Sequence, residues 1–377
     1  MNIVFIVVCS FPYGDASSVR ALNICHLLND AGHTVHVISD YPSVSPADCD
    51  FCTYEHVADR SGSLIDRRTV VKKSLSALKA YCLANRVEAV LTNARFDRYD
   101  KILRFCKNKG LKLVVENCEW YHFSNFKLKL LDFRYWKNQW MIKKGFKRAD
   151  GFISISRLLD RHNGSFGIPS VRIPTIMDTD NVQYRTECTE SDTVKIAYTG
   201  NPGKSKELLS PIILALAENK ELQEKIQLHI YGPDKNKVLY NIGNDKKLLL
   251  SAGSSVIIHG KVPQNEMNSI VKDSDYVVFL RPNRRSSNAG FPTKLGESMA
   301  AGTPVISNDT GDIGLYLKNG VNGFVCDDTS KGAVIKILAK ITEMNKEQKE
   351  SMRKQARLCA EEYFDYKKYV NEVKKIF

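Results

Sequence analysis

Apolar runs alternate with longer amphipathic stretches along all 377 residues of the chain. The apolar runs indicate strands at 3–9, 35–39, 89–92, 111–116 and 151–156, and again at 195–198, 227–231, 255–259, 276–280 and 303–307. Stretches with helical spacing lie between most of them, including 19–31, 206–218 and 346–362. Val/Ile/Leu-rich runs are typical of parallel strands covered on both faces. The alternation therefore predicts two doubly wound α/β domains.

The boundary between the halves is marked by composition. Residues 178–193 are polar, rich in Asp, Glu and Thr, and lack apolar periodicity. We therefore expect a first domain at 1–185, a second at 186–360 and a C-terminal segment at 361–377. No apolar run reaches the ~18 residues of a membrane span. Residues 3–8 are typical of a buried strand rather than a signal peptide, which favours a cytoplasmic location.

The net charge of +13 narrows the set of partners. It suits nucleic acid, an anionic membrane face or anionic small molecules, but no nucleic-acid-binding signature is present, which favours the latter two. Ten cysteines in such a chain indicate reduced, mostly buried thiols. Cys49 and Cys52 form a lone pair without a second pair at zinc spacing, so we interpret them as chance spacing.

One segment stands out for its chemistry. The run Gly290-Phe291-Pro292-Thr293-Lys294 follows the strand at 276–280 and precedes a helix. Backbone N–H groups at such a helix start, together with the helix dipole, favour a phosphate. Glu297 lies about one turn inside the helix, where it can reach a polar ligand.

This segment resembles the nucleotide-sugar loop of the large retaining glycosyltransferase family 4. In that family the loop contains a pair of glutamates eight positions apart, followed by a small-residue turn that Met299 to Val305 match. Glu297 matches the second glutamate, whereas Ala289 occupies the place of the first. The resemblance implies the GT-B fold: two Rossmann-like domains facing a cleft, acceptor side first and nucleotide sugar second. It also implies that the segment 361–377 returns to the first domain.

Further candidates in the second half come from strand ends. The resemblance gives diphosphate contacts to the loop from Gly200 to Lys206, where Lys204 and Lys206 stand without the family's arginine; a solvated surface is the alternative for each lysine. Arg281, with Arg284 and Arg285, could supply the missing cation or be a basic loop tip. By resemblance, Val262 reads the base edge, Glu297 binds ribose, and amides of Gly290 to Lys294 contact sugar and β-phosphate.

The first half carries two candidate loops. Residues 10–18 form a Pro/Gly/Ser turn after the first strand, where ligands bind in such sheets. By resemblance, Tyr13, Gly14 and Arg20 face the substrates, although Arg20 could equally be a solvated charge, and Ser17 or Ser18 an N-cap. Glu119 and His122 follow the strand at 111–116, with Glu119 a candidate catalytic group and His122 on the acceptor side.

A basic and aromatic stretch from Phe126 to Arg148 has eight basic residues against one acid, Asp132. It resembles an interfacial anchor for anionic lipid, with a solvated helix carrying some core aromatics as the alternative. Two Asp-x-Asp patterns, at 48–50 and 178–180, are too short to predict a metal site.

We therefore expect a retaining glycosyltransferase acting in cell-surface polysaccharide synthesis. It would use a nucleotide diphosphate sugar and a glycan or polyprenyl-diphosphate-linked acceptor, without metal or other cofactor and without nucleic acid, on the inner membrane face. Lys204, Lys206, Glu297 and Glu119 are the candidate catalytic residues. A GT-B nucleotide-sugar epimerase and a non-catalytic sugar-nucleotide-binding relative remain alternatives, the latter because of Ala289.

Overall fold

The structure, a computed structural model, describes residues 1–44, 49–59, 66–93, 96–122, 131–188, 191–203 and 206–377. This chain divides into two compact units. The first comprises Met1–Ile176, Asn288–Phe291 and Asp365–Phe377, and the second comprises Met177–Ser287 and Pro292–Phe364. The sequence placed the boundary at 185/186 and the final segment at 361, whereas the units divide after Ile176 and the final segment begins at Asp365.

The first unit is built on a parallel sheet with strand order β3-β2-β1-β4-β5-β6-β7. Five of these strands match predicted runs. The short strands β3 and β7 were not predicted, because the sheet-edge strand β3 is fully exposed and neither is a long apolar run. The strands are β1 Asn2–Phe11, β2 Thr34–Pro42, β3 Thr53–His56, β4 Ala89–Thr92, β5 Lys112–Asn117, β6 Gly151–Ser154 and β7 Ser170–Arg172.

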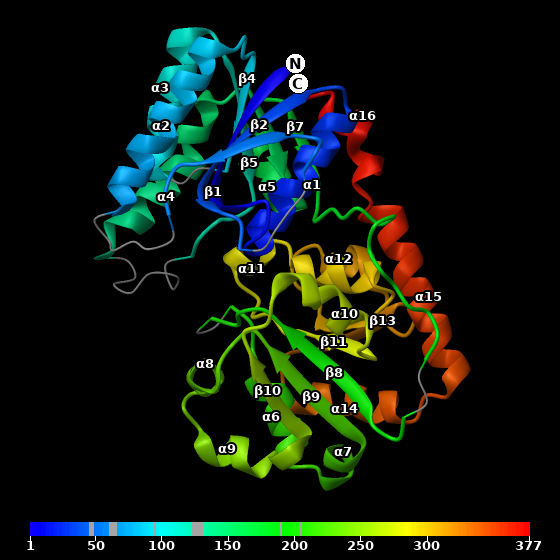
Figure 1. Ribbon diagram of the computed structural model, residues 1–377. Helices are drawn as coiled ribbons and strands as arrows, with labels where there is room; N and C mark the ends of the chain where they lie inside the picture. The colour runs from blue at the N-terminus through cyan, green and yellow to red at the C-terminus, as the bar shows by residue number, and fades with distance from the viewer. Residues whose placement is uncertain (45–48, 60–65, 94–95, 123–130, 189–190, 204–205) are drawn as a thin grey trace. The chain divides into compact units, whose positions relative to one another are not determined.

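Helices cover both faces of this sheet (Figure 1). One apolar cluster joins the sheet to α1 and to the C-terminal segment, through residues such as Ile24 and Val373. A second cluster joins the other face to α2, α3 and α4 through Leu78, Ile102 and Ile142. The helices are α1 Ala16–Asp30, α2 Asp66–Ala84, α3 Phe96–Lys109, α4 Phe133–Lys143, α5 Arg157–Gly164 and α16 Val370–Val373, with 3-10 turns at Gly145–Arg148 and Tyr366–Tyr369.

The second unit is also a parallel sheet, with strand order β10-β9-β8-β11-β12-β13. Its strands are β8 Val194–Thr199, β9 Ile226–Tyr231, β10 Val256–Gly260, β11 Tyr276–Val278, β12 Val305–Asn308 and β13 Gly323–Cys326, of which β13 was not predicted. Its helices are α6 Ser210–Ala217, α7 Lys220–Lys225, α8 Lys235–Asn241, α9 Lys246–Ser251, α10 Met267–Lys272, α11 Arg285–Ala289, α12 Thr293–Ala300, α13 Ile313–Tyr316, α14 Lys331–Thr342 and α15 Lys346–Tyr363. Two 3-10 turns lie at Gly253–Ser255 and Gln264–Glu266. Two doubly wound α/β units, as the sequence predicted, are confirmed.

Two helix starts differ from the sequence expectation. Asp15, rather than Ser17 or Ser18, caps α1: its carboxylate accepts from the N–H groups of Ser17 and Ser18. The helix expected from 206 begins only at Ser210, because the amides of Lys206 and Glu207 both donate to the carbonyl of Pro202 in a tight turn. This turn places the segment after β8 beside the neighbouring strand ends.

Candidate functional site

The carboxyl ends of β8, β9 and β10 in the second unit are each followed by a glycine or end in one. Gly200 and Gly232 have φ angles of +96° and +112°, a region that other residues rarely adopt. A Cβ on Gly232 would lie 2.6 Å from the Gly200 carbonyl oxygen, so only glycine fits there. The chain therefore turns sharply at this edge of the sheet, where ligands bind in open α/β sheets.

Arg281 lies at this edge, three residues beyond β11. Its side chain is buried at 5% exposure, yet its Nε and Nη1 atoms have no hydrogen-bond partner among the described residues. Burial lowers the pKa of the guanidinium, and the Glu207 carboxylate partly offsets that effect. Asn308, at the end of β12, holds the Arg281 backbone from both sides: it accepts from Arg281 N at 2.8 Å and donates to Arg281 O at 2.9 Å.

A buried guanidinium with two orphaned donors is unusual, because such donors are normally paired. The two hydrogen bonds from Asn308 also fix the backbone from which the Arg281 side chain extends. This geometry suits a guanidinium that donates to an anion carrying several oxygen atoms, such as a phosphate.

Helix α12 begins in the same unit at Thr293. Pro292 precedes it, and no side chain caps its first turn. Glu297 lies one turn inside and is partly buried; no side-chain hydrogen bond or ion pair of its carboxylate is found among the described residues. Burial raises the pKa of Glu297, with Lys294 acting in the opposite direction. The helix start and Glu297 thus offer N–H donors and a carboxylate acceptor to a ligand.

Lys294 points into the protein. Its ammonium forms a buried ion pair with Glu207 and lies 4.3 Å from the centroid of the Tyr198 ring. The Tyr198 hydroxyl donates to the same Glu207 oxygen, Oε2. Burial raises the pKa of Glu207, but the Lys294 charge together with the hydrogen bonds from Lys294 and Tyr198 outweighs burial, so that this pKa is lowered. Because two donors meet one oxygen, we assign the group as a carboxylate paired with an ammonium.

Lys206, one of the two predicted diphosphate lysines, is exposed, and Lys204 lies outside the described residues. The segment around Lys206 is anchored on two sides. Asn241 of α8 donates to the carbonyls of Gly203 and Glu207 at 3.0 and 2.9 Å, and Leu208 N donates to Leu280 O at 2.8 Å. The bond from Leu208 to Leu280 ties the segment to the chain just after β11, next to Arg281.

The other residues predicted to bind the donor are divided between the two units. Val262 is partly buried two residues after β10. Gly290 and Phe291 group with the first unit, whereas Pro292, Thr293 and Lys294 belong to the second. The structure thus brings Gly200, Lys294 and Arg281 together at the carboxyl ends of the strands in the second unit. Gly290 and Phe291 belong to the first unit.

In the first unit, the loop after β1 is shaped by serines. Ser18 Oγ donates to the Ser10 carbonyl at 2.6 Å, and a Cβ on Gly14 would lie 2.7 Å from this Oγ, which leaves room only for glycine. Tyr13 is partly buried. Arg20 is buried: its Nε donates to Glu116 at 2.7 Å, and its other nitrogens donate to the carbonyls of Pro174 and Ile173. Arg20 therefore holds β5 and the chain after β7 together, and the alternative of a solvated charge is wrong.

Glu119 and His122 follow β5 as predicted. Glu119 is exposed and accepts a hydrogen bond from the Tyr121 hydroxyl, and His122 is partly buried. Gln139 of α4 supports this segment: it accepts from Trp120 Nε1 at 3.1 Å and donates to the Tyr121 carbonyl at 3.0 Å.

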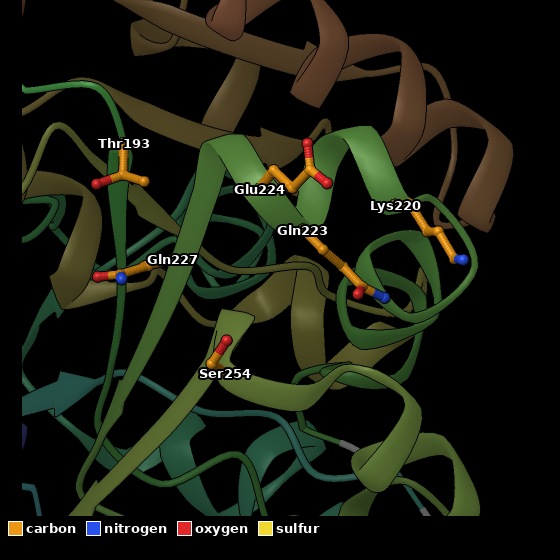
Figure 2. A pocket seen from close by; sticks show the side chains of 6 residues that line it. All are labelled: Thr193, Lys220, Gln223, Glu224, Gln227 and Ser254. Atoms are coloured by element: carbon orange, nitrogen blue, oxygen red, sulfur yellow. The ribbon is translucent and has the colours of Figure 1, made fainter.

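A hollow of about 370 Å³ in the second unit is shown in Figure 2. It lies beside the starts of β8, β9 and β10, at the end of the sheet opposite Gly200 and Arg281. Parallel strands present their ligand sites at the other edge, so we do not assign the chemistry here. The lining residues are Thr193, Lys220, Gln223, Glu224, Gln227 and Ser254.

Sequence reasoning missed Tyr198, Glu207 and Asn308. Glu207 and Lys294 are 87 positions apart, so one sequence carries no sign that they meet. A weak signal was available for Asn308, because a polar residue ends an otherwise apolar strand at the edge where ligands bind. Among the described residues, no group of three His, Cys, Asp or Glu side chains has the arrangement of a metal site. No helix of the described chain is both long and apolar enough to cross a bilayer.

Comparisons with known proteins agree with this architecture. Residues 190–358 match the family described as "Glycosyl transferases group 1". No curated protein matches the sequence significantly. Sucrose-phosphate synthase from Thermosynechococcus elongatus is 15% identical, with a TM-score of 0.76 over 100% of this chain and 98% of that one.

Two further solved structures are similar over nearly the full chain. Anabaena HepE in complex with UDP-glucose is 14% identical, with a TM-score of 0.68 and coverage of 100% of both chains. WaaG, a glycosyltransferase involved in lipopolysaccharide biosynthesis, is 14% identical, with a TM-score of 0.69 over 98% of this chain and 99% of that one.

The two parallel-sheet units are the architecture of the GT-B glycosyltransferases. Residues 190–358, which contain the site formed by Gly200, Arg281 and α12, are the part of the chain that is similar to the glycosyl transferases group 1 family.

Proposed function

We propose that the protein is a retaining glycosyltransferase that moves a hexosyl or N-acetylhexosaminyl group from a nucleoside diphosphate sugar to a glycan or lipid-linked acceptor. The acceptor would be a precursor of a cell-surface polysaccharide. The observation that carries the proposal is Arg281, a rigidly held and buried guanidinium whose Nε and Nη1 lack partners among the described residues. A donor diphosphate would satisfy both atoms.

The remaining groups near Arg281 would each contact a different part of the donor. The uncapped first turn of α12 would donate to the β-phosphate, and Glu297 would accept hydrogen bonds from the ribose hydroxyls. Lys206, with Lys204 outside the described residues, would meet the outer phosphate oxygens from solvent. The complexes of HepE with UDP and with UDP-glucose support a uridine nucleotide as the first donor to test.

Catalysis would be electrostatic and independent of metal. As the glycosidic bond to the donor breaks, negative charge develops on the leaving diphosphate, and Arg281 and Lys206 would stabilise it. No enzymic nucleophile is evident in the sequence, so we propose attack by the acceptor on the same face from which the diphosphate leaves, which retains the anomeric configuration. Glu119, already bonded to Tyr121, would act on the acceptor side together with Tyr13 and His122, whereas Arg20 is committed to its protein partners and would support this side only structurally.

We further propose that the first unit binds anionic membrane lipid through the exposed face of α4 and the turn that follows it. The aromatic residues Phe133, Trp136 and Trp140 are 64%, 57% and 48% exposed at helical spacing on α4. The same region exposes six cations: Arg134, Lys137, Lys143, Lys144, Lys147 and Arg148. Its acid Asp132 is buried and paired with Arg134.

Cations and aromatics share the exposed face, so the region is not cleanly amphipathic; the proposal relies on aromatic side chains suited to the headgroup zone and on cations suited to anionic lipid. The residues 123–130, part of the predicted anchor, lie outside the described chain.

The enzymatic proposal is tested by a donor and product assay. The protein is titrated calorimetrically with UDP, GDP and ADP, and then incubated with the matching sugar nucleotide and a lipid-linked acceptor. We expect micromolar binding of one diphosphate and a product whose anomeric configuration, by NMR, equals that of the donor. Inversion would reject the mechanism, binding without transfer would favour the non-catalytic alternative, and epimerised donor would favour the epimerase.

The membrane proposal is tested by vesicle co-sedimentation. Each cation near an anionic surface contributes ~1 kcal/mol, and salt screens it. Binding should rise with anionic lipid, fall with salt, and be weakened by Lys143→Glu with Lys147→Glu, but not by Lys225→Glu, a control at an exposed lysine of the second unit. Equal binding to neutral and anionic vesicles would reject the electrostatic part.

A further inference from the structure

The Lys294–Glu207–Tyr198 cluster has no assigned role in the proposed donor contacts. It joins two segments that meet the donor in that proposal: Glu207 ends the turn after β8, and Lys294 is the second residue of α12. Tyr198 belongs to β8 itself and donates to Glu207 Oε2. All three side chains are buried, and the cluster lies against Gly200, where a Cβ would come within 3.2 Å of Lys294 Cε.

The environment of Lys294 leaves its ammonium little freedom to leave Glu207. The Tyr198 ring lies 4.3 Å away and the Phe279 ring 5.9 Å away, so the charge is enclosed by two aromatic faces as well as by the carboxylate. The Tyr198 hydroxyl accepts a further bond from the ammonium at 3.3 Å. Moving Lys294 toward a ligand would strand the Glu207 charge in the interior, which is costly.

The turn after β8 is also held by Asn241 and by the bond from the Leu208 N–H to the Leu280 carbonyl. Those contacts fix the turn to α8 and β11, and neither reaches α12. The pair of Glu207 and Lys294 supplies the link to α12.

We propose that Glu207 and Lys294, supported by Tyr198, are positioning residues that fix the turn after β8 against the first turn of α12, and that Lys294 does not itself bind the donor phosphates. The inference rests on the proposed donor site. Arg281 and Lys206 contact the diphosphate, while the buried pair sets the spacing between the two segments that carry phosphate donors.

The sign of one substitution separates positioning from direct binding. If Lys294 bound phosphate, Glu207 would compete for its ammonium, and Glu207→Ala would strengthen UDP binding. If the pair positions the segments, Glu207→Ala weakens UDP binding by about tenfold or more, Lys294→Met does the same, and the double variant loses no more than either single one. Glu207→Gln, which keeps the acceptor for Tyr198, recovers most of the affinity.

The experiment combines titration calorimetry with hydrogen–deuterium exchange of the ligand-free protein. Exchange should rise in Lys294→Met and Glu207→Ala in peptides covering 206–209 and 293–297, and remain unchanged in the control Lys225→Met, which breaks an exposed pair with Glu221. Glu207→Leu with Lys294→Met serves if the single variants fail to fold, since an apolar pair of similar volume is tolerated.

Unchanged exchange in all these variants, or tighter UDP binding by Glu207→Ala, overturns the inference. Raised exchange in a protein whose parent binds none of UDP, GDP and ADP supports the positioning role and rejects the proposed donor instead.

Discussion

Replacing Arg281 by methionine should make the protein more stable and less able to bind nucleotide. Arg281 is 5% exposed, and its Nε and Nη1 have no hydrogen-bond partner within the described part of the chain. An unsatisfied buried donor costs ~1–3 kcal/mol, and methionine keeps most of the buried stem, so the net gain should be about 2 kcal/mol. In a unit of this size that gain raises the melting temperature by roughly 4–8 °C.

The same change removes the donors that a diphosphate would use. Two charge-assisted hydrogen bonds contribute at least ~3 kcal/mol, which corresponds to about a 100-fold loss of UDP affinity. Uridine, which lacks phosphate, should bind with unchanged affinity. Titration calorimetry and thermal melting of the same preparations measure both effects.

Arg353 provides the matched control in the same unit. It is 1% exposed, and its three nitrogens donate to the carbonyls of Arg185, Ser274 and Lys272. Arg353→Met strands three acceptors, so it should cost about 3 kcal/mol or more of stability while UDP affinity stays the same. A destabilised Arg281→Met variant that binds UDP as well as the parent would refute the assignment of Arg281 to phosphate.

Three further predictions concern the donor. Glu297→Gln should weaken UDP binding by ~1.5–3 kcal/mol, the size of a hydrogen bond to a charged group. Burial raises the pKa of Glu297, so its negative charge lowers the stability of the fold above that pKa. The Glu297→Gln variant should therefore have a higher melting temperature than the parent at pH 8, and this difference should vanish below the unfolded-state pKa of about 4.3. An equal difference at both pH values would contradict this explanation. Replacing Lys204 and Lys206 together by alanine should lower turnover far more than melting temperature, and turnover within twofold of the parent would rule the pair out. Since Ala289 cannot hold a sugar hydroxyl, deoxy and N-acetylated donors should be tolerated, whereas a ~10⁴-fold preference in kcat/KM for the fully hydroxylated sugar would show a strict polar pocket.

The sequence carried the architecture because long apolar runs report buried parallel strands directly. The strands at 89–92 and 227–231 were predicted within one residue of their observed bounds. The strands that escaped prediction, β3, β7 and β13, have three or four residues each; β3 and β7 are largely polar, and the apolar part of β13 is too short to distinguish a strand from a loop. Local capping was also misjudged: Asp15 is the N-cap residue, and Ser18 completes a reciprocal capping box by accepting from the Asp15 N–H instead of being the N-cap itself.

The candidate site was only partly predictable, because its buried charges are fixed by contacts distant in sequence. The residues near Lys294 in the sequence do not indicate that its side chain is buried, because its partner Glu207 lies in the turn after β8, far away in the sequence. The same limit applied to Arg20, whose three partners are Glu116, Ile173 and Pro174. Residue type and loop position identified these residues as candidates, but only the fold distinguishes a structural cation from one with donors to spare.

Three buried arginines of the chain differ in how many of their donors are paired. Arg20 and Arg353 are as deeply buried as Arg281, and each donates to three protein oxygens. Such pairing is the rule for charges in a protein interior. The Arg281 guanidinium differs, because its Nε and Nη1 have no hydrogen-bond partner among the described residues. Its backbone is nevertheless held in place by two hydrogen bonds to Asn308. The Glu207 carboxylate only partly offsets the cost of burying the guanidinium charge. The arrangement is favourable only when an external anion completes it, and this is the physical reason for locating the donor diphosphate at Arg281.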